Sequence, residues 1–178
     1  MSSKLLAVAV VSCLALVAAG EARAQQTPAP TNPLDTVPDK MPFDLPYGAP
    51  ISLERAQTAI AAAVAEARKH EWKLNVAVVD SGANLVAFQR MDGAQLASIQ
   101  IAEHKARAAA AYRRETKVFE NAIQLNNFNY VATLDGVIAS RGGIPLVEGG
   151  RIIGAIGCSG GAGAQDEVAC KAGAATIK

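Results

Sequence analysis

Apolar residues follow a helical period after Ser52 and give way to strand-like runs beyond residue 73. Ser52 can cap a helix that ends near His70, because apolar residues within it recur three and four positions apart, at 53, 56, 60, 63, 64 and 67. The runs LNVAVVD (74–80) and LVAFQR (85–90) flank the turn SGAN. This arrangement predicts an antiparallel hairpin over residues 74–90.

Two further helices are predicted in the middle of the chain. An alanine-rich helix extends from Gln95 to about Arg114, and Thr116 can cap a short helix, KVFENAIQLN. Residues 129–141 are ambiguous, because YVATLDGVIAS could form a strand with a turn at Asp135-Gly136.

The C-terminal part predicts a second hairpin and a closing helix. IPLVEGGRIIGAIGCSG can turn at Gly149-Gly150, and QDEVACKAGAATI follows as a helix. From Ile152 to Cys158 the residues on both faces of the expected strand are small or apolar, which is typical of a strand that is buried on both sides. Either helices cover both faces, or a second subunit covers one of them. Strands joined by short turns predict an α+β fold, an antiparallel sheet covered by helices.

Residues 1–24 have the composition of a secretory signal peptide. A lysine precedes an apolar run (5–19), and A-R-A at 22–24 supplies a cleavage site. A lipoprotein is the alternative, because the residues up to Cys13 resemble a lipoprotein cleavage box. We expect a periplasmic or secreted protein with no transmembrane segment after signal removal.

Residues 25–50 are expected to be an extended, proline-rich linker, and residues 51–178 a single domain. The linker holds seven of the eight prolines, and Met41 to Tyr47 could dock on the domain. Removing residues 1–24 takes two of the 17 basic and one of the 16 acidic residues and leaves 15 of each. This balance disfavours nucleic acid as a partner.

The segment GAIGCSGGAGAQDE contains the G-x-S-x-G pattern of a hydrolase nucleophile at Ser159. Both histidines, His70 and His104, precede that serine, so the serine–acid–histidine order of α/β-hydrolases is absent. Asp166 and Glu167 would occupy the positive end of the following helix and repel a phosphate. The segment therefore predicts a strand and a glycine turn rather than a catalytic loop.

His104 is the candidate ligand for a metal cofactor. It shares a stripe of the long helix with small apolar residues, namely Ala97, Ile101, Ala108 and Ala111. A histidine there is either a hydrogen-bonded core residue or a ligand facing a cavity, and imidazole is a common axial ligand of haem iron. Met91 and Tyr112 could also ligate iron.

The loop RMDGA and the start of the long helix could line a pocket. Arg90 and Lys105 could then hold carboxylates, including haem propionates. The alternative is an ordinary loop ion pair between Arg90 and Asp92.

An enzyme using this pocket would need Asp92 or Asp166 as a general base, and no carboxylate is visibly placed to have a raised pKa. A binding protein is therefore favoured over a catalyst.

Cys158 and Cys170 remain after removal of the signal peptide. An oxidising compartment allows them to form a disulfide if the chain folds back between them. The alternative is two small, buried thiols.

Three segments together resemble one family: VVDSGANLVAFQRMDGA (78–94), AEHKARAAA (102–110) and GGIPLVEGGRIIGAIGCSGGAGAQDEVACKAG (142–173). In order and spacing they resemble the GlcG/HbpS family of haem-binding, haem-degrading-type domains, which is related to the C-terminal domain of PduO-type adenosyltransferases. The resemblance implies a profilin-like or longin-like fold with about five strands. It also implies a homo-oligomer, possibly an octamer, and haem as the cofactor.

The resemblance carries over to individual positions. Arg90 to Gly93 match the family's R-M-D-G loop, and Lys105 stands in its helical K-A pair. Cys158 departs from the pattern, since the family usually has an aliphatic residue there, and His104 maps to no fixed family ligand.

The leading hypothesis is an exported haem- or tetrapyrrole-binding protein in haem handling or redox sensing. The alternatives are an enzyme or enzyme subunit acting on a small oxygenated acid or aromatic metabolite, and a structural oligomer without a ligand.

Overall fold

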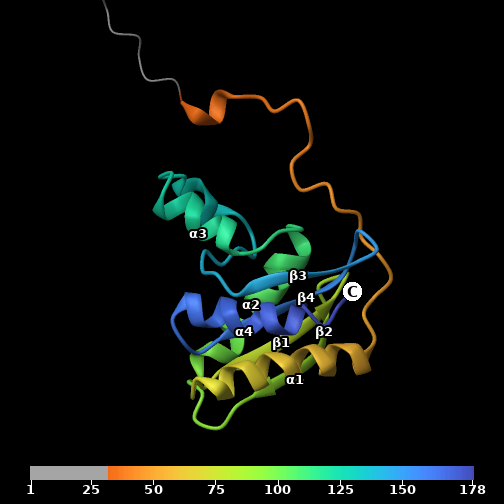
Figure 1. The fold of residues 1–178 in the computed structure, drawn as a ribbon. Coiled ribbons are helices and arrows are strands. Elements are labelled where there is room, and N and C mark those ends of the chain that lie inside the picture. Colours follow the sequence, from red (N-terminus) through yellow and green to blue (C-terminus); the bar gives the residue numbers. More distant parts are fainter. Residues whose placement is uncertain (1–31) are drawn as a thin grey trace, which may run out of the picture. The chain divides into compact units, whose positions relative to one another are not determined.

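A computed structural model describes residues 32–178 of the chain (Figure 1). The expected signal peptide and the alternative lipoprotein box lie outside these residues. The chain divides after Asp39 into a short N-terminal unit, in which Pro33–Asp35 form a 3-10 helix, and a compact domain from Lys40 to Lys178. Within the described residues, every helix is too short or too polar to cross a membrane.

The domain contains four helices and one four-stranded antiparallel sheet. The helices are α1 (Leu53–Lys69), α2 (Ala97–Ala111), α3 (Lys117–Gln124) and α4 (Gly163–Ala174). The strands are β1 (Asn75–Asp80), β2 (Leu85–Arg90), β3 (Gly143–Glu148) and β4 (Arg151–Ser159), in the order β2-β1-β4-β3. Both predicted hairpins are present, and the α+β class is confirmed.

The expectation of about five strands is wrong by one, because residues 129–141 do not join the sheet. Asn129–Thr133 form the 3-10 helix η2, and turns and bends follow. Val131 is the one buried residue of η2. This stretch therefore lacks the alternation of buried and exposed side chains that is typical of a strand in a sheet. The Thr133 hydroxyl donates to the Tyr130 carbonyl at 2.6 Å, which satisfies a polar group locally.

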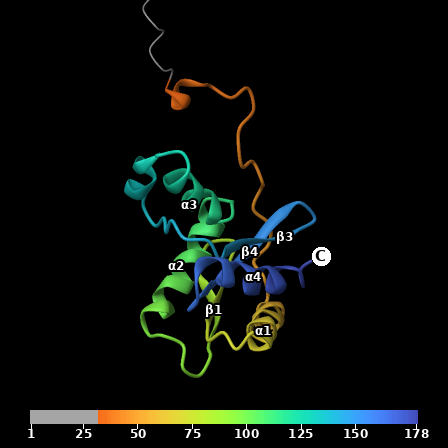
Figure 2. The same ribbon diagram turned by 60° about the vertical axis from the view of Figure 1, so that its left-hand side comes forward.

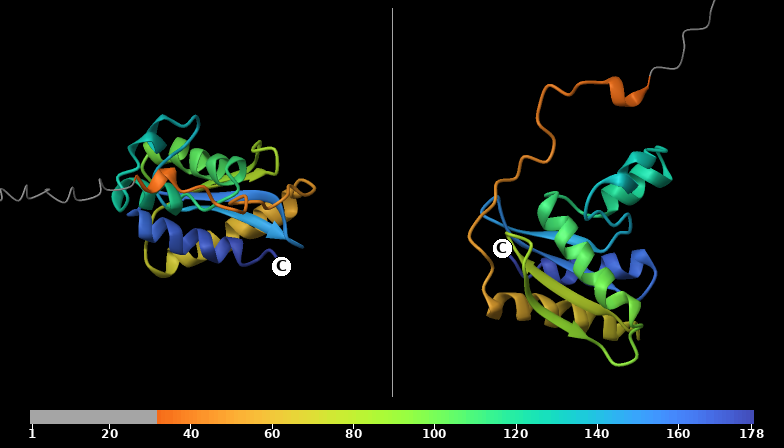
Figure 3. Two further views of the ribbon diagram at one scale, coloured as in Figure 1. Left: turned by 90° about the horizontal axis from the view of Figure 1, so that it is seen from above. Right: turned by 180° about the vertical axis from the view of Figure 1, so that it is seen from behind.

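Helices cover both faces of the sheet (Figures 2 and 3). Helices α1 and α4 pack on one face, and α2 packs on the other, against β1 and β4. Every residue of β4 from Ile152 to Ser159 is buried. The prediction of a strand buried on both sides is therefore confirmed, and helices of the same chain provide the cover.

Glycines let α2 approach the sheet without intervening side chains. A Cβ added at Gly157 would lie 2.5 Å from the Ala106 amide nitrogen, and one at Gly143 would lie 2.6 Å from Thr116 Cγ2. These distances are shorter than van der Waals contact, so both positions require glycine. The Gly143 amide donates to the Thr116 hydroxyl at 2.9 Å. Thr116 thus precedes α3 as expected, but its side chain ties α3 to β3 instead of capping the helix.

The end of the proline-rich segment docks on the domain. Tyr47 bridges to Ile152, and the Gly48 amide donates to the Ile152 carbonyl at 2.8 Å. The Tyr47 hydroxyl donates to the Ala111 carbonyl at the end of α2, at 2.9 Å. Tyr47 docks as expected, whereas Met41 is exposed.

Cys158 of β4 and Cys170 of α4 form a disulfide. Their Cα atoms are 5.7 Å apart, and both residues are fully buried in the core between the sheet and the α1–α4 layer. The bond fastens α4 to the last strand.

Candidate functional site

The sequence-predicted site residues do not form one pocket. Arg90, Met91 and Asp92 line a hollow of about 330 Å³ after β2. His104 lines a separate groove of about 540 Å³ along α2. Lys105 lies in the interior of the protein.

Most of the stripe of α2 that contains His104 faces outward, which rules out the alternative of a core position for His104. Ala97, His104 and Ala111 are exposed, Ile101 is half-buried and Ala108 is buried. The buried residues of α2 are Ser98, Ala102, Lys105, Ala106, Ala108, Ala109 and Ala110. His104 is therefore a surface imidazole rather than a hydrogen-bonded core residue.

The groove beside His104 is open and largely apolar. Leu96 is 70% exposed at its start, and Ala97, Ile99 and Ile101 contribute further apolar surface. Neither ring nitrogen of His104 makes a hydrogen bond to residues 32–178, so both are available. An unengaged imidazole next to apolar surface fits an axial ligand of haem iron.

Lys105 is not available to a ligand carboxylate. Its ammonium donates to Asp166 Oδ2 at 2.8 Å, and the two side chains are only 1% and 3% exposed. The idea that Lys105 holds a propionate beside Arg90 is therefore incorrect for this fold. The cause is a partner 61 residues further along the chain, which brings the ammonium inward.

Burial raises the pKa of Asp166, and the Lys105 ammonium opposes that shift. No carboxylate was expected from sequence to have a raised pKa, so the raised pKa of Asp166 is a finding of the structure. Asp166 Oδ1 also accepts the Gly161 amide at 3.0 Å, which places the carboxylate at the N-terminus of α4 as expected. Because the Asp166 side chain is only 3% exposed and pairs with Lys105, it is not accessible to a substrate as the general base that the enzyme hypothesis required.

Glu167 completes the acidic start of α4. It accepts from Lys117 at 3.2 Å, from Arg141 at 3.3 Å and from Lys171. Its pKa is lowered because these hydrogen bonds and charges outweigh its burial. The cations at this helix end are thus neutralised within the protein, and phosphate binding is not supported.

The end of β2 and the loop that follows contain another candidate iron ligand, Met91. The Met91 side chain packs against the main core, while Arg90 and Asp92 are exposed and form no ion pair with each other in the described part of the chain. Tyr112 is also engaged. Its hydroxyl donates to the Asp135 carbonyl at 2.6 Å, and its ring stands edge-on to Phe119 with centroids 5.2 Å apart.

Ser159 is the last residue of β4 and is buried. The two histidines lie elsewhere, His104 on the outer side of α2 and His70 at the end of α1, where its ring stacks on Trp72 with centroids 4.3 Å apart. A serine hydrolase site is thus excluded on geometry as well as on residue order. Within residues 32–178 there is also no cluster of three or more His, Cys, Asp or Glu side chains that could hold a metal ion.

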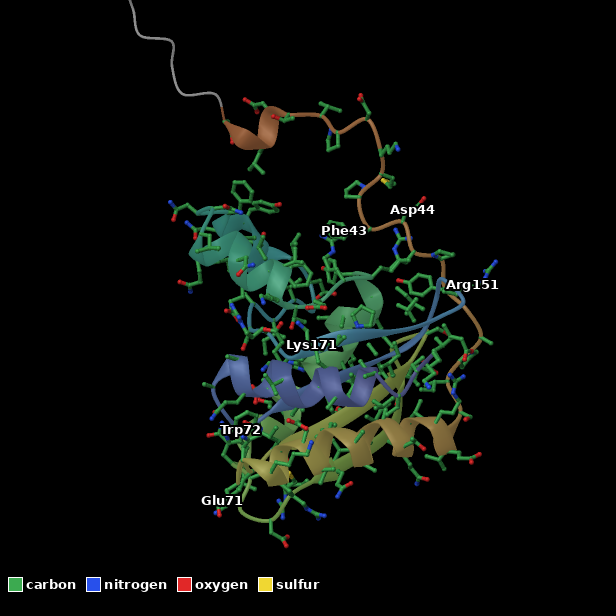
Figure 4. The ribbon with its side chains drawn as sticks, in the orientation of Figure 1. Phe43, Asp44, Glu71, Trp72, Arg151 and Lys171 are labelled. Carbon is green, nitrogen blue, oxygen red and sulfur yellow. A yellow bond between two sulfur atoms is a disulfide. The ribbon has the colours of Figure 1, made fainter. Side chains whose placement is uncertain are left out.

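Sequence reasoning missed a hollow of about 430 Å³ between the docked N-terminal segment, the start of α3 and the edge strand β3. Phe43 lies on the extended segment before α1 (Figure 4), and the Arg114 guanidinium lies 3.5 Å from its ring centroid. The signal available in the sequence was the pair Arg113-Arg114 directly after an alanine-rich helix.

Comparison with known proteins agrees with this fold. Residues 51–175 match the family described as "Haem degrading protein HbpS-like". Protein GlcG of Escherichia coli K12 is 41% identical over 109 residues, which are 61% of this chain and 81% of that protein.

Two solved structures share the architecture. A double mutant of HbpS from Streptomyces reticuli is 29% identical, with a TM-score of 0.68 over 80% of this chain and 97% of that one. A structure described as a PduOC:heme complex is 26% identical, with a TM-score of 0.66 over 73% of this chain and 96% of that one. The family match spans the whole sheet with α1 through α4, and the chain therefore belongs to the HbpS-like family.

Proposed function

We propose that this protein is an exported haem-binding protein in which His104 approaches the iron. The observation that carries the proposal is the unengaged His104 imidazole in an open apolar groove on α2. Membership of the HbpS-like family and the likeness to the PduOC:heme complex support haem, or a related tetrapyrrole, as the ligand class. The composition of residues 1–24 supports export to the periplasm or beyond the cell.

The residues around His104 divide the tasks of binding. The imidazole would supply the axial nitrogen, and Leu96, Ala97 and Ile101 would cover part of the ring face. Bound haem would supply redox and oxygen chemistry at its iron, which is the basis for proposing haem handling or redox sensing.

Arg107 takes the place that sequence reasoning had given to Lys105. It lies three residues after His104 on the same side of α2 and is exposed, with its guanidinium 3.1 Å from Glu103. A surface ion pair of this kind is weak, so a propionate can compete for the guanidinium. Arg107 would therefore serve as a propionate partner, about one helical turn from His104.

The groove is too open to enclose a haem on its own. A small-molecule site usually buries most of its ligand, whereas this groove is lined only by Leu96 and residues of α2 in the described part of the chain. A second copy of the chain would supply a further wall in a homo-oligomer, which the family resemblance also implies.

Replacing His104 by alanine tests the site directly. We expect wild-type protein to bind haemin saturably with a shifted Soret band. His104→Ala should bind haemin at least about tenfold more weakly, because it loses the axial bond to iron. A tenfold loss corresponds to about 1.4 kcal/mol of binding free energy, and we expect the axial bond to contribute more than that. His70→Ala is the matched control, since His70 is the other histidine and already stacks on Trp72. Unchanged affinity and spectrum in His104→Ala would refute the ligand assignment. Absence of saturable binding in wild type would refute haem binding itself.

A further inference from the structure

Arg114 is a half-buried cation that forms no ion pair with an acidic residue of the described part of the chain. Its Nε donates to the Tyr112 carbonyl at 2.9 Å, and among residues 32–178 no carboxylate lies within ion-pair distance of it. The guanidinium lies 3.5 Å from the ring centroid of Phe43 and 5.5 Å from that of Phe119. Aromatic faces hold a guanidinium in place but leave its in-plane N–H groups free to donate.

Other cations near Arg114 are already paired. Arg113 donates to the Leu45 carbonyl at 3.2 Å and lies 3.8 Å from Asp44, and Lys117 lies 3.2 Å from Glu167. Glu115, the one acidic residue that lines the hollow, lies 3.9 Å from Lys171. The hollow thus carries three positive charges and one negative charge, and Arg114 is the cation left to bind an anion.

Two sides of this hollow are apolar. Ile144, Pro145 and Val147 of β3 form one side, and Phe43 and Leu45 of the docked segment form another. Its volume of about 430 Å³ falls within the range of small-molecule sites. Apolar walls around one unpaired guanidinium favour a ligand that combines a carboxylate with an aromatic or branched aliphatic group.

We propose that this hollow is a second binding site, specific for a small apolar carboxylate that pairs with Arg114. It is separate from the His104 groove, because the two hollows have no lining residue in common. The site therefore does not depend on the proposal for haem.

The test uses benzoate and its uncharged analogue benzamide, titrated into the whole chain without haem and followed by calorimetry and by amide NMR shifts. We expect benzoate to bind at least about tenfold more tightly than benzamide, because a charge-assisted pair with a guanidinium is worth that much. The shifted amides should include those of residues 113–118 and those of Ile144 and Val147.

Arg114→Gln should reduce benzoate binding about tenfold and leave benzamide binding unchanged, while Arg114→Lys keeps part of the preference. Arg151→Gln, at an exposed arginine outside this hollow, is the matched control and should bind benzoate as wild type does. His104→Ala should also bind benzoate normally. Equal affinity for benzoate and benzamide, or shifts away from residues 113–118, would overturn the proposal. It would also be overturned if benzoate does not bind and Arg114→Gln instead dissociates an oligomer, since a second chain would then cover the hollow.

Discussion

Replacing Lys105 by methionine should lower the free energy of unfolding by about 3–5 kcal/mol, the cost of leaving one partner of a buried ion pair alone. Methionine keeps most of the volume of the lysine stem, so the loss comes mainly from the Asp166 carboxylate, which is 3% exposed and bonded to that ammonium at 2.8 Å. Denaturant unfolding monitored by circular dichroism measures the change.

The pH dependence separates this cause from a simple packing defect. Without Lys105, the pKa of Asp166 rises further, because only burial and the hydrogen bonds from the Gly160 and Gly161 amides remain. A carboxyl group whose pKa is raised on folding contributes stability below its unfolded pKa and loses it as the pH rises through its folded pKa. The deficit of Lys105→Met should therefore be smaller at about pH 5 than at about pH 8.

Two variants provide controls for Lys105→Met. Lys69→Met makes the same change at a lysine that is 67% exposed, and it should cost less than about 0.5 kcal/mol. In Lys105→Met/Asp166→Asn neither residue of the pair carries a charge, so this double variant should be more stable than the sum of the single effects predicts. A pH-independent loss, or strict additivity, would show that the ion pair is not the cause.

Reducing the Cys158–Cys170 disulfide should lower the free energy of unfolding by about 3 kcal/mol and Tm by about 10 °C. The bond closes a loop that contains the turn after β4 and the first half of α4. In the reduced, unfolded chain this loop is free, which stabilises the unfolded state relative to the folded one. Calorimetry of oxidised and reduced protein, with intact mass to confirm the gain of two hydrogens, measures the effect.

The double variant Cys158→Ala/Cys170→Ala is the control for the reductant. It should resemble reduced wild type, apart from the small packing loss of two buried sulfur atoms, and it should be insensitive to reductant. Equal Tm for oxidised and reduced wild type would mean that the cross-link contributes nothing to stability.

The hairpins were predictable because their signals are local. Turn residues at Ser81-Gly82 and Gly149-Gly150 stand between apolar runs, and the strands follow within one residue of the expected bounds. Helix α1 was predictable for the same reason, since Ser52 accepts the Arg55 amide as its cap. The structure of residues 129–141 was not predictable in this way, because an apolar residue every few positions is compatible both with a strand and with a 3-10 turn that has one buried side chain.

The orientation of α2 was not predictable from its own residues. Alanines occur on all sides of this helix, so apolar spacing gives little indication of which side faces the sheet. Glycines of β4 and β3 decide it, because α2 approaches most closely at Gly157 and Gly143. That orientation places Lys105 inside, away from the expected pocket, and His104 outside, beside a groove.

The dispersal of the predicted site has the same origin. Arg90 and Asp92 follow β2, His104 lies on α2, and Lys105 pairs with Asp166 of α4. Sequence proximity suggested one pocket, whereas tertiary packing separates these residues. The Arg114 hollow was missed because Phe43 lies 71 positions earlier in the chain, beyond the reach of any local pattern.

Whether the protein is exported and binds haem can be measured on the mature protein isolated from the extracytoplasmic fraction of cells grown with haem. Its absorbance spectrum and haem content report ligand and location in one sample. We expect a chain cleaved after residue 24 that carries a Soret band and a fixed ratio of haem to protein. A chain that stays in the cytoplasm, or one that is exported without haem when haem is abundant, would contradict this expectation.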